Sequence, residues 1–200
     1  MLTSKRSLSA EDRLAAYTFE TAGVTVFRGP ETDVLARFLG AAEISGADAV
    51  ARVTADCPLL CPSVARRVVE EFRRGDSRYD YVSNTVSRTF PHGLDVEVFT
   101  ADALRTAGRG AVLEFDREHV TPFLWRQPSR FRIGQVTDSV DRSGHRWTLD
   151  TPEDFDLISR IYADLYPGLP AFEYHDILGC LARHPDWSSI NRHVAQRSET

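Results

Sequence analysis

The pattern Thr-x-Asp-x-Pro occurs twice in this chain, at residues 54–58 and again at residues 148–152. In the first copy a run of small and β-branched residues leads to Asp56, and two residues later Pro58 prevents a strand from continuing. We therefore expect Asp56 at the carboxyl end of a strand, which is where open α/β sheets bind their ligands. The second copy gives Asp150 the same setting. Two such acids indicate one shared site.

Helical and strand-like segments alternate in the first third of the chain. In chain order they are a helix over residues 9–22, a strand over residues 24–27, a helix from Val34 that Gly46 ends, the strand before Asp56, and a helix from Pro62 to Gly75. Such alternation is typical of an α/β fold with a mostly parallel sheet covered by helices on both faces.

The rest of the chain adds further strands and helices. Strands are expected over residues 79–83, 94–99 and 131–137, and helices over residues 101–109, 114–127, 152–165 and after Glu173. Pro122 should interrupt the second of these helices. The strict alternation of residues 94–99 predicts a strand with one dry and one wet face. The length of 200 residues indicates a single domain over residues 1–200.

Composition excludes several classes of protein. The formal net charge of −5 argues against a general nucleic-acid binder, because proteins that track phosphates usually carry a basic surplus. No apolar run approaches the roughly 20 residues that a membrane-spanning helix needs, and the first residues lack the apolar core of a signal peptide, so we expect a cytoplasmic protein. The three cysteines indicate neither a disulfide framework nor a zinc site, and Cys57 is expected to be a buried thiol.

Either aspartate alone is equally well explained as the N-cap of the helix that follows it. The pair favours a magnesium site, because Mg²⁺ is commonly bound through one or two carboxylates together with substrate phosphates. His92 lies in a polar loop, where contact with a substrate and no role at all are both open, and for His119 a structural hydrogen bond is slightly favoured. Asp154 and Asp156 have the form D-x-D of a metal motif, but inside a helix we expect them on a solvated face.

Arginine residues could bind phosphate or carboxylate groups through the planar fork of the guanidinium. The candidates are Arg28, Arg37, Arg52, Arg88, Arg117 and Arg146. Any one of them alone is more often a surface charge.

Six blocks of the sequence, taken together, resemble a known family. They are residues 27–37, 52–59, 81–85, 91–98, 117–122 and 146–154. In the same order they resemble the SpsF-like cytidylyltransferases, which are similar to the enzymes that make CMP-activated sialic acid and CMP-activated Kdo. The resemblance implies a GT-A-like, nucleotide-diphospho-sugar transferase fold. It also implies that a sugar or sugar-acid hydroxyl attacks the α-phosphorus of CTP and releases pyrophosphate, in the synthesis of polysaccharide or glycan precursors.

The resemblance also implies roles for particular residues. Asp56 and Asp150 match the family's catalytic, Mg²⁺-binding aspartates. Arg28, Asp33 and Arg37 match positions near the nucleotide. The sugar acceptor would be held by His92, Asp95, Glu97, Arg117, Glu118, His119 and Arg146. CTP and the sugar are the expected partners, with no nucleic acid and no membrane, and a homodimer or a partner chain is expected.

The chain departs from the family pattern at its beginning. Family members begin with a strand and a phosphate-cradling loop of the form A-R-x-x-S-x-R-L-P-x-K, whereas Leu2, Thr3 and Ser4 look like the end of a later strand. The resemblance therefore implies an N-terminally incomplete domain without the first strand and the basic loop. Two readings stay open: an enzyme, or one part of a split or truncated enzyme, and a degenerate member that binds a nucleotide or a protein without catalysis. The two intact acids favour the first reading and the absent loop favours the second.

Overall fold

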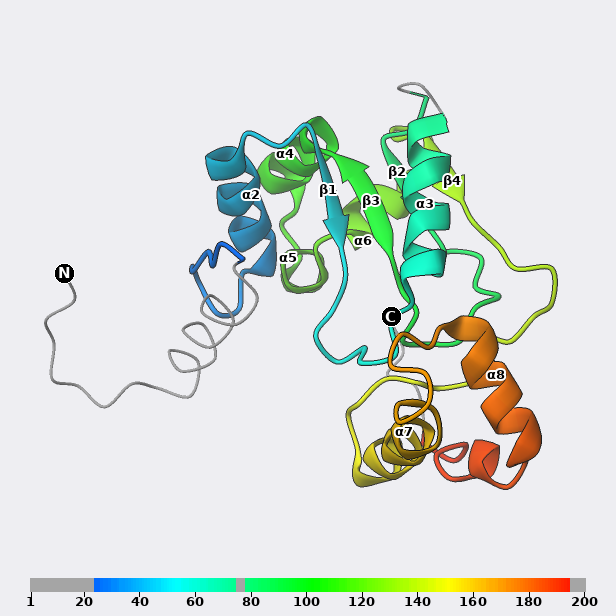
Figure 1. The fold of residues 1–200 in the computed structure, drawn as a ribbon. Coiled ribbons are helices and arrows are strands. Elements are labelled where there is room, and N and C mark those ends of the chain that lie inside the picture. Colours follow the sequence, from blue (N-terminus) through cyan, green and yellow to red (C-terminus); the bar gives the residue numbers. More distant parts are fainter. Residues whose placement is uncertain (1–23, 75–77, 195–200) are drawn as a thin grey trace, which may run out of the picture.

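The structure is a computed structural model that describes residues 24–74 and 78–194. In chain order the elements are α2 (Val34–Ser45), β1 (Ala49–Arg52), α3 (Pro62–Arg74), β2 (Tyr81–Ser83), β3 (Glu97–Thr100), α4 (Ala101–Gly110), α5 (Glu114–His119), α6 (Pro122–Trp125), β4 (Ile133–Gln135), α7 (Pro152–Leu165), α8 (Tyr174–Arg183) and a 3-10 turn at Trp187–Ser189 (Figure 1). The helix expected over residues 9–22 lies outside the described residues.

The strands form one mixed sheet in the order β1-β3-β2-β4. β3 is antiparallel to both of its neighbours, and β4 is parallel to β2, so β1, β2 and β4 share one direction. This mixed sheet with helices confirms the expected α/β fold class, whereas the mostly parallel pairing is not found, since β1-β3 and β3-β2 are antiparallel. None of the helices among the described residues is long and apolar enough to cross a membrane.

The strand register gives the sheet two apolar faces. Tyr81 and Phe99 are paired and belong to the cluster under α2, α4 and α6, whereas Val82 and Val98 are paired and belong to the cluster with α3, α7 and α8. Figure 1 shows α2 and α4 on one side of the sheet and α3 on the other. Each large side chain that is fully buried in this way stabilises the fold by about 1.5–3 kcal/mol relative to leaving it exposed.

Most helix ends lie where the sequence predicts them. Gly46 ends α2 with a left-handed backbone (φ 63°), and its N–H donates to two carbonyl oxygens in the last turn of that helix. Pro62 begins α3, and Pro122 begins α6 after α5 has ended. Thr151 caps α7 and forms a capping box with Asp154. These ends are set by local chemistry, so the sequence alone could locate them.

The strand expected over residues 24–27 is not formed, and this prediction was wrong. The segment has no regular secondary structure and joins no strand of the sheet. Instead the Phe27 ring lies against α2, so close to Gly40 that a Cβ atom there would be only 2.3 Å from the ring. Packing of one aromatic ring on a helix has replaced strand pairing.

The strands are shorter than expected around the two acids. β1 ends at Arg52, and Asp56 lies in a turn that begins two residues after Val53. The residues before Asp150 form no strand, and only an isolated parallel bridge joins Arg146 to His92. Both acids therefore lie in loops beyond the sheet and not directly at strand ends.

The strict alternation of residues 94–99 predicted a strand with one solvent-exposed face, and this prediction was wrong. β3 covers only Glu97–Thr100, and Glu97 is just 5 % exposed because neighbouring elements cover both faces of the strand. On α7, Phe155 is 62 % exposed, although it has the same helical spacing as Ile158, Ile161 and Leu165, which are buried.

A mainly apolar groove of about 600 Å³ lies beside β1, which pairs only with β3 among the described residues. Its walls include Val26, Phe38, Ile44 and Val50. The edge of the sheet next to the strand that precedes Asp56 is thus bordered by apolar surface.

Candidate active site

One hydrogen bond joins the two Thr-x-Asp-x-Pro segments, and a second joins the first segment to α7. The Leu149 N–H donates to the Asp56 carbonyl oxygen at 2.8 Å, and the Tyr162 hydroxyl on α7 donates to the Pro58 carbonyl oxygen, also at 2.8 Å. The first segment follows β1, and the second leads into α7. The structure therefore brings the backbones of Asp56 and Asp150 together. Their role as metal ligands stays a prediction.

A pocket of about 200 Å³, here called the Asp56 pocket, contains Asp56 but not Asp150 in its wall. Three of the predicted acceptor-binding residues, Asp95, Glu97 and His119, share this wall. Aromatic residues of α5 and α6, Phe115 and Trp125, complete it. The pocket thus combines carboxylates with flat apolar rings, a lining that suits a hydroxyl-bearing ring such as a sugar or a ribose.

Glu97 lines this pocket, and both of its carboxylate oxygens are bound by neighbouring side chains. Its Oε1 accepts hydrogen bonds from the Tyr81 hydroxyl and from the Thr121 Oγ1, both at 2.6 Å, and its Oε2 pairs with Arg52. Burial, and secondarily the Glu97 carboxylate, raise the pKa of Tyr81 well above its usual value, so the phenol keeps its proton. Glu97 therefore holds four elements together, and its predicted contact with the acceptor stays untested.

Asp95 and Arg88 form a two-pronged ion pair at the rim of the same pocket. The two guanidinium nitrogens of Arg88 donate to the two carboxylate oxygens at 2.5 and 2.8 Å. Such a fork is geometrically rigid. Arg88 is therefore committed to Asp95, and its expected contact with phosphate would have to be made in addition to this pair.

His119 is held in the pocket wall by an unusual turn. Val120 has a positive φ of 73°, and the Thr121 N–H donates to the His119 carbonyl oxygen at 2.8 Å, which defines a γ-turn. A β-branched residue rarely adopts this strained backbone, and strain of this kind clusters at functional sites. The His119 ring packs on Phe115, with ring centroids 4.3 Å apart, and has no hydrogen-bond partner among the described residues. The structural hydrogen bond favoured for His119 is not found there.

The predicted nucleotide-binding residues lie together at the start of α2, and none of them lines the Asp56 pocket. Asp33 caps α2 by accepting a hydrogen bond from the Ala36 N–H at 2.9 Å, and Arg37 donates to two carbonyl oxygens of the preceding loop. Arg28 is exposed in that loop. Asp33 and Arg37 shape the loop in which Arg28 lies, and contact of the three residues with a nucleotide stays a prediction.

Arg117 points away from the Asp56 pocket and toward Asp33. Its Nε and Nη2 donate to one Asp33 oxygen at 2.8 and 2.5 Å. Partial burial raises the pKa of Asp33, but the hydrogen bonds from Ala36 and Arg117 outweigh it, so that pKa lies below its usual value. A predicted acceptor residue and a predicted nucleotide residue are thus paired with each other. The neighbouring Glu118 is exposed.

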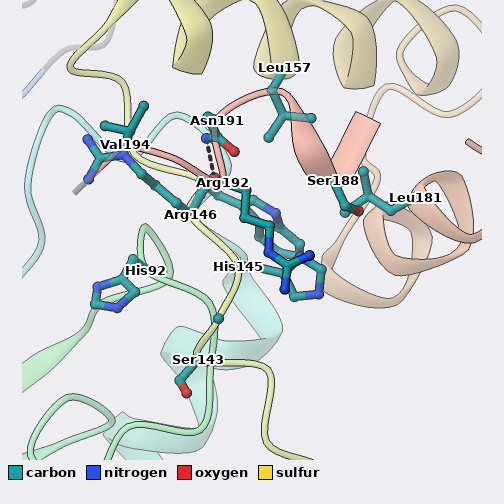
Figure 2. Close-up of a pocket in the computed structure, with 12 residues that line it drawn as sticks. His92, Ser143, His145, Arg146, Leu157, Leu181, Ser188, Asn191, Arg192 and Val194 are labelled. Atoms are coloured by element: carbon teal, nitrogen blue, oxygen red, sulfur yellow. Dashed lines mark hydrogen bonds between the residues drawn. The ribbon is translucent and has the colours of Figure 1, made fainter. Parts of the chain in front are cut away.

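His92 lies in a second cavity of about 170 Å³, here called the His92 cavity, which Figure 2 shows with its lining side chains. Burial lowers the pKa of His92 to about 4, helped by the positive charge of Arg88, so the ring is neutral at pH 7. His145 and Asn191 also line this cavity. The structure therefore separates His92 from the Asp56 pocket, although its loop residue Asp95 reaches that pocket.

Asp154 was misjudged from sequence, because it lies in the protein interior and not on a solvated helix face. It is fully buried and binds Arg146 through two guanidinium nitrogens, whereas Asp156 pairs with Arg160 on the exposed side of α7. A usable signal was present: Thr151 and Asp154 have the spacing of a capping box, which directs the second acid back toward the helix start.

Cys57, next to Asp56, is buried as expected. Desolvation raises its pKa to about 12, so it is a thiol and not a reactive thiolate at neutral pH. A cysteine nucleophile is therefore not supported at this site.

Asp56 and Asp150 offer carboxylate oxygens, the donors that Mg²⁺ prefers, on two turns that a backbone hydrogen bond joins. No cluster of three or more His, Cys, Asp or Glu side chains among residues 24–74 and 78–194 is arranged to hold a metal ion. Two carboxylates are, however, the usual protein contribution to a Mg²⁺ ion that also binds phosphates and water. Such a donor set is chemically compatible with Mg²⁺, and the role of the two acids as its ligands stays a prediction.

Comparison with known proteins decides the family. Residues 9–175 match the sequence profile named cytidylyltransferase. The chain belongs to the cytidylyltransferase family. It is thus related to the nucleotidyltransferases that use CTP, and its resemblance to the SpsF-like members is confirmed.

Two curated relatives cover most of the chain. The uncharacterized protein MJ1063 of Methanocaldococcus jannaschii is 33% identical over 194 residues, which are 96% of this chain and 77% of that protein. The spore coat polysaccharide biosynthesis protein SpsF of Bacillus subtilis is 31% identical over 182 residues, which are 88% of this chain and 72% of that protein.

A solved structure shows the same fold. The cytidylyltransferase from Leptospira borgpetersenii serovar Hardjo-bovis superposes with a TM-score of 0.84 and 27% identity, over 95% of this chain and 78% of that one. This likeness confirms the expected nucleotide-sugar transferase type of fold for this cytidylyltransferase-family chain.

Proposed function

We propose that this cytidylyltransferase-family chain transfers CMP from CTP to a hydroxyl group of a sugar or sugar acid, and that Asp56 and Asp150 bind the required Mg²⁺. The observation that carries the proposal is the hydrogen bond from the Leu149 N–H to the Asp56 carbonyl oxygen, which joins the two acid-bearing turns. The activated sugar would serve as a precursor of a polysaccharide or glycan, in keeping with the name of the SpsF relative.

The reaction forms one bond and breaks one. The acceptor oxygen attacks the α-phosphorus of CTP, the bond from that phosphorus to the bridging oxygen breaks, and pyrophosphate leaves with that oxygen. The acceptor hydroxyl loses its proton. Catalysis of such transfers consists mainly of positioning the groups and of stabilising charge.

Different side chains of the site would carry out the positioning, the exclusion of water and the proton transfer. Asp56 borders both the pocket and the second acidic turn, so it lies where acceptor and triphosphate would meet. Phe115 and Trp125 give the pocket an apolar wall that excludes water from that side, and the Arg126 guanidinium lies over both rings. His119 is available to accept the acceptor's proton. Bound Mg²⁺ would neutralise charge that develops on the phosphates.

A pyrophosphate-release assay with CTP, Mg²⁺ and a panel of sugars and sugar acids tests the proposal. Asp56→Asn and Asp150→Asn should each lower the rate by on the order of 100-fold or more, since each removes a charged ligand at the reacting phosphate. Asp156→Asn is the matched control, because this acid lies on the exposed side of α7 and, among the residues that the structure describes, pairs only with Arg160. Its rate should equal that of the unsubstituted protein.

The outcomes of these assays distinguish a catalytic protein from a non-catalytic binding protein. Turnover that survives in Asp56→Asn or Asp150→Asn would show that the metal assignment is wrong. If no acceptor gives turnover and CTP does not bind, the catalytic proposal fails for this chain, and the non-catalytic reading gains support.

A further inference from the structure

Arg146 makes contacts that do not fit its expected role as a binder of substrate. Its guanidinium is buried between two acids of its own chain, Asp150 and Asp154. Hydrogen bonding to Asp154 raises the pKa of Arg146 above its already high value, so it is always charged. Because its donors are used by these two acids, Arg146 is better placed to orient them than to bind a ligand.

Asp154 holds the Arg146 guanidinium in place. This carboxylate is fully buried and accepts from the Arg146 Nε at 3.0 Å and from the Arg146 Nη2 at 2.9 Å. It also accepts from the backbone N–H groups of Asp150 and Thr151, both at 3.1 Å, and from the Asn191 side chain at 2.8 Å. A buried carboxylate with this many donors has one orientation only.

Asn191 anchors the backbone of Arg146. Its side-chain amide donates to the Arg146 carbonyl oxygen at 2.8 Å, as the dashed line in Figure 2 shows, and to Asp154 Oδ1. On the other side the bridge to His92 restrains the same stretch, with the Trp147 N–H donating to the His92 carbonyl oxygen at 2.7 Å. Both ends of the arginine are therefore fixed.

The fixed guanidinium reaches the candidate metal ligand. Arg146 Nη2, the nitrogen that bonds to Asp154, also donates to Asp150 Oδ2 at 2.5 Å. The Asp150 side chain is 45 % exposed, so without this bond its carboxylate would be free to change rotamer. The bond occupies one carboxylate oxygen and leaves Oδ1 available for another ligand.

We propose that Arg146 is a positioning residue that holds the Asp150 carboxylate ready for the metal ion, and that Asp154 and Asn191 serve to hold Arg146. This inference rests on the proposed function, in which Asp150 binds Mg²⁺. Outer partners of metal ligands commonly change metal affinity by about 10–100-fold when they are replaced. Asn191 and Asp154 contact Arg146, and Arg146 contacts Asp150. Replacement of Arg146 would therefore alter how the Asp150 carboxylate is held.

The test compares Arg146→Gln, Arg146→Lys and the control Arg160→Gln. Arg160 also forms an ion pair with an aspartate of α7, at 2.8 Å, but on the exposed side of the helix. The first readout is the affinity for Mn²⁺ in the presence of CTP, followed by electron paramagnetic resonance, and the second is the Mg²⁺ concentration that gives the half-maximal rate.

We expect Arg146→Gln to weaken Mn²⁺ binding by about 10-fold or more and to raise the Mg²⁺ requirement equally, with little change in KM for the sugar. Arg146→Lys keeps the charge but not the fork, so it should recover part of the loss. Arg160→Gln should match the unsubstituted protein. Unchanged metal affinity in Arg146→Gln, or a higher KM for the sugar or for CTP as the main effect, would overturn the proposal.

Two further variants distinguish a wrong role for Arg146 from a failure of the variant to fold and from a wrong role for Asp150. If Arg146→Gln does not fold because it leaves Asp154 buried without a counter-charge, the double variant Arg146→Gln/Asp154→Asn removes both charges and should show the same loss of metal affinity. Asp150→Asn tests the underlying assignment. Normal Mn²⁺ binding in Asp150→Asn refutes the metal role of Asp150, whereas lost binding in Asp150→Asn with normal binding in the Arg146 variants refutes only the role of Arg146.

Discussion

Gly93 shows how one residue without a side chain brings a loop into place. Its φ is 101°, a conformation that other residues rarely adopt, and a Cβ atom would lie 2.6 Å from the Trp147 carbonyl carbon and oxygen. This close approach allows the two hydrogen bonds of the His92 backbone, to His145 and from Trp147. The loop that carries Asp95 is thereby joined to the segment that carries Asp150.

Gly93→Ala should therefore destabilise the protein by about 2 kcal/mol or more, since backbone strain and a collision with backbone atoms add together. Urea unfolding measures the change. Gly144→Ala is the matched control, because a Cβ there meets no atom within 4 Å, and it should alter stability by less than about 0.5 kcal/mol. Equal effects of the two substitutions would show that the close contact at Gly93 is not important.

The ionisation of Asp154 makes the stability of the fold depend on pH. Its burial raises its pKa, but hydrogen bonds from Arg146, Asn191 and the Asp150 N–H outweigh this, and the resulting pKa is about 2, against 3.8 for an unperturbed aspartate. A carboxyl group with a lowered folded-state pKa stabilises the fold above its unfolded-state pKa. That stabilisation is lost as the pH falls from about 4 through about 2.

We expect Asp154 to contribute about 2 kcal/mol of pH-dependent stability in this window, by the usual conversion of pKa shift to free energy. Chemical unfolding of the unsubstituted protein and of Asp154→Asn at several pH values between 2 and 6 measures it. The difference in unfolding free energy between the two proteins should shrink as the pH is lowered. A difference that does not depend on pH would contradict the ion pair with Arg146.

At the scale of elements, α2 is fastened to α5 by a residue with two functions. Asp33 caps α2 through one carboxylate oxygen and pairs with Arg117 of α5 through the other. Since α5 also carries Phe115 and His119 of the Asp56 pocket, the start of α2 braces one wall of that pocket.

Substitution of Asp33 can separate its two functions. Asp33→Ala should cost about 1–2 kcal/mol, since it removes both cap and ion pair, whereas Asp33→Ser keeps a good cap and should cost only about 0.2–1 kcal/mol, as is usual for a partly exposed pair. Thermal unfolding gives both values. If the serine variant is as unstable as the alanine variant, the cap contributes nothing and the ion pair alone fastens α2.

Elements with local signals could be predicted from the sequence, and those without them could not. Pro62, Pro122 and Thr151 mark the starts of α3, α6 and α7, because the backbone or side-chain chemistry of one residue sets each start. Strand bounds depend on partners distant in sequence. Residues 24–27 therefore failed as a strand, although they have suitable β propensity.

At the scale of the whole molecule, the candidate site lies where the loop after β1 meets the loop before α7 and the wall formed by α5 and α6. No single element holds it. A ligand that contacts several of these segments should therefore stabilise the entire fold and not only one loop.

CTP with Mg²⁺ should raise the unfolding temperature of the unsubstituted protein. Ligand at about 100 times its Kd adds about 2.7 kcal/mol to the free energy of unfolding. The shift should be absent without Mg²⁺ and absent in Asp56→Asn, while Asp156→Asn keeps it. Differential scanning fluorimetry measures these shifts, and an equal shift with and without Mg²⁺ would argue against a shared metal.

The sequence by itself determined the repeated acidic turns, most helix ends and the family resemblance, because each of these follows from residues close together in the chain. Only the tertiary structure decided which acids are buried and which side chains are already engaged. Glu97 resembles a surface acid in the sequence, yet it lies inside because Arg52, from a distant strand, balances its charge, and Asp154 is likewise balanced by Arg146 from the loop before α7. Burial of a charge depends on its partner, and only the fold specifies that partner.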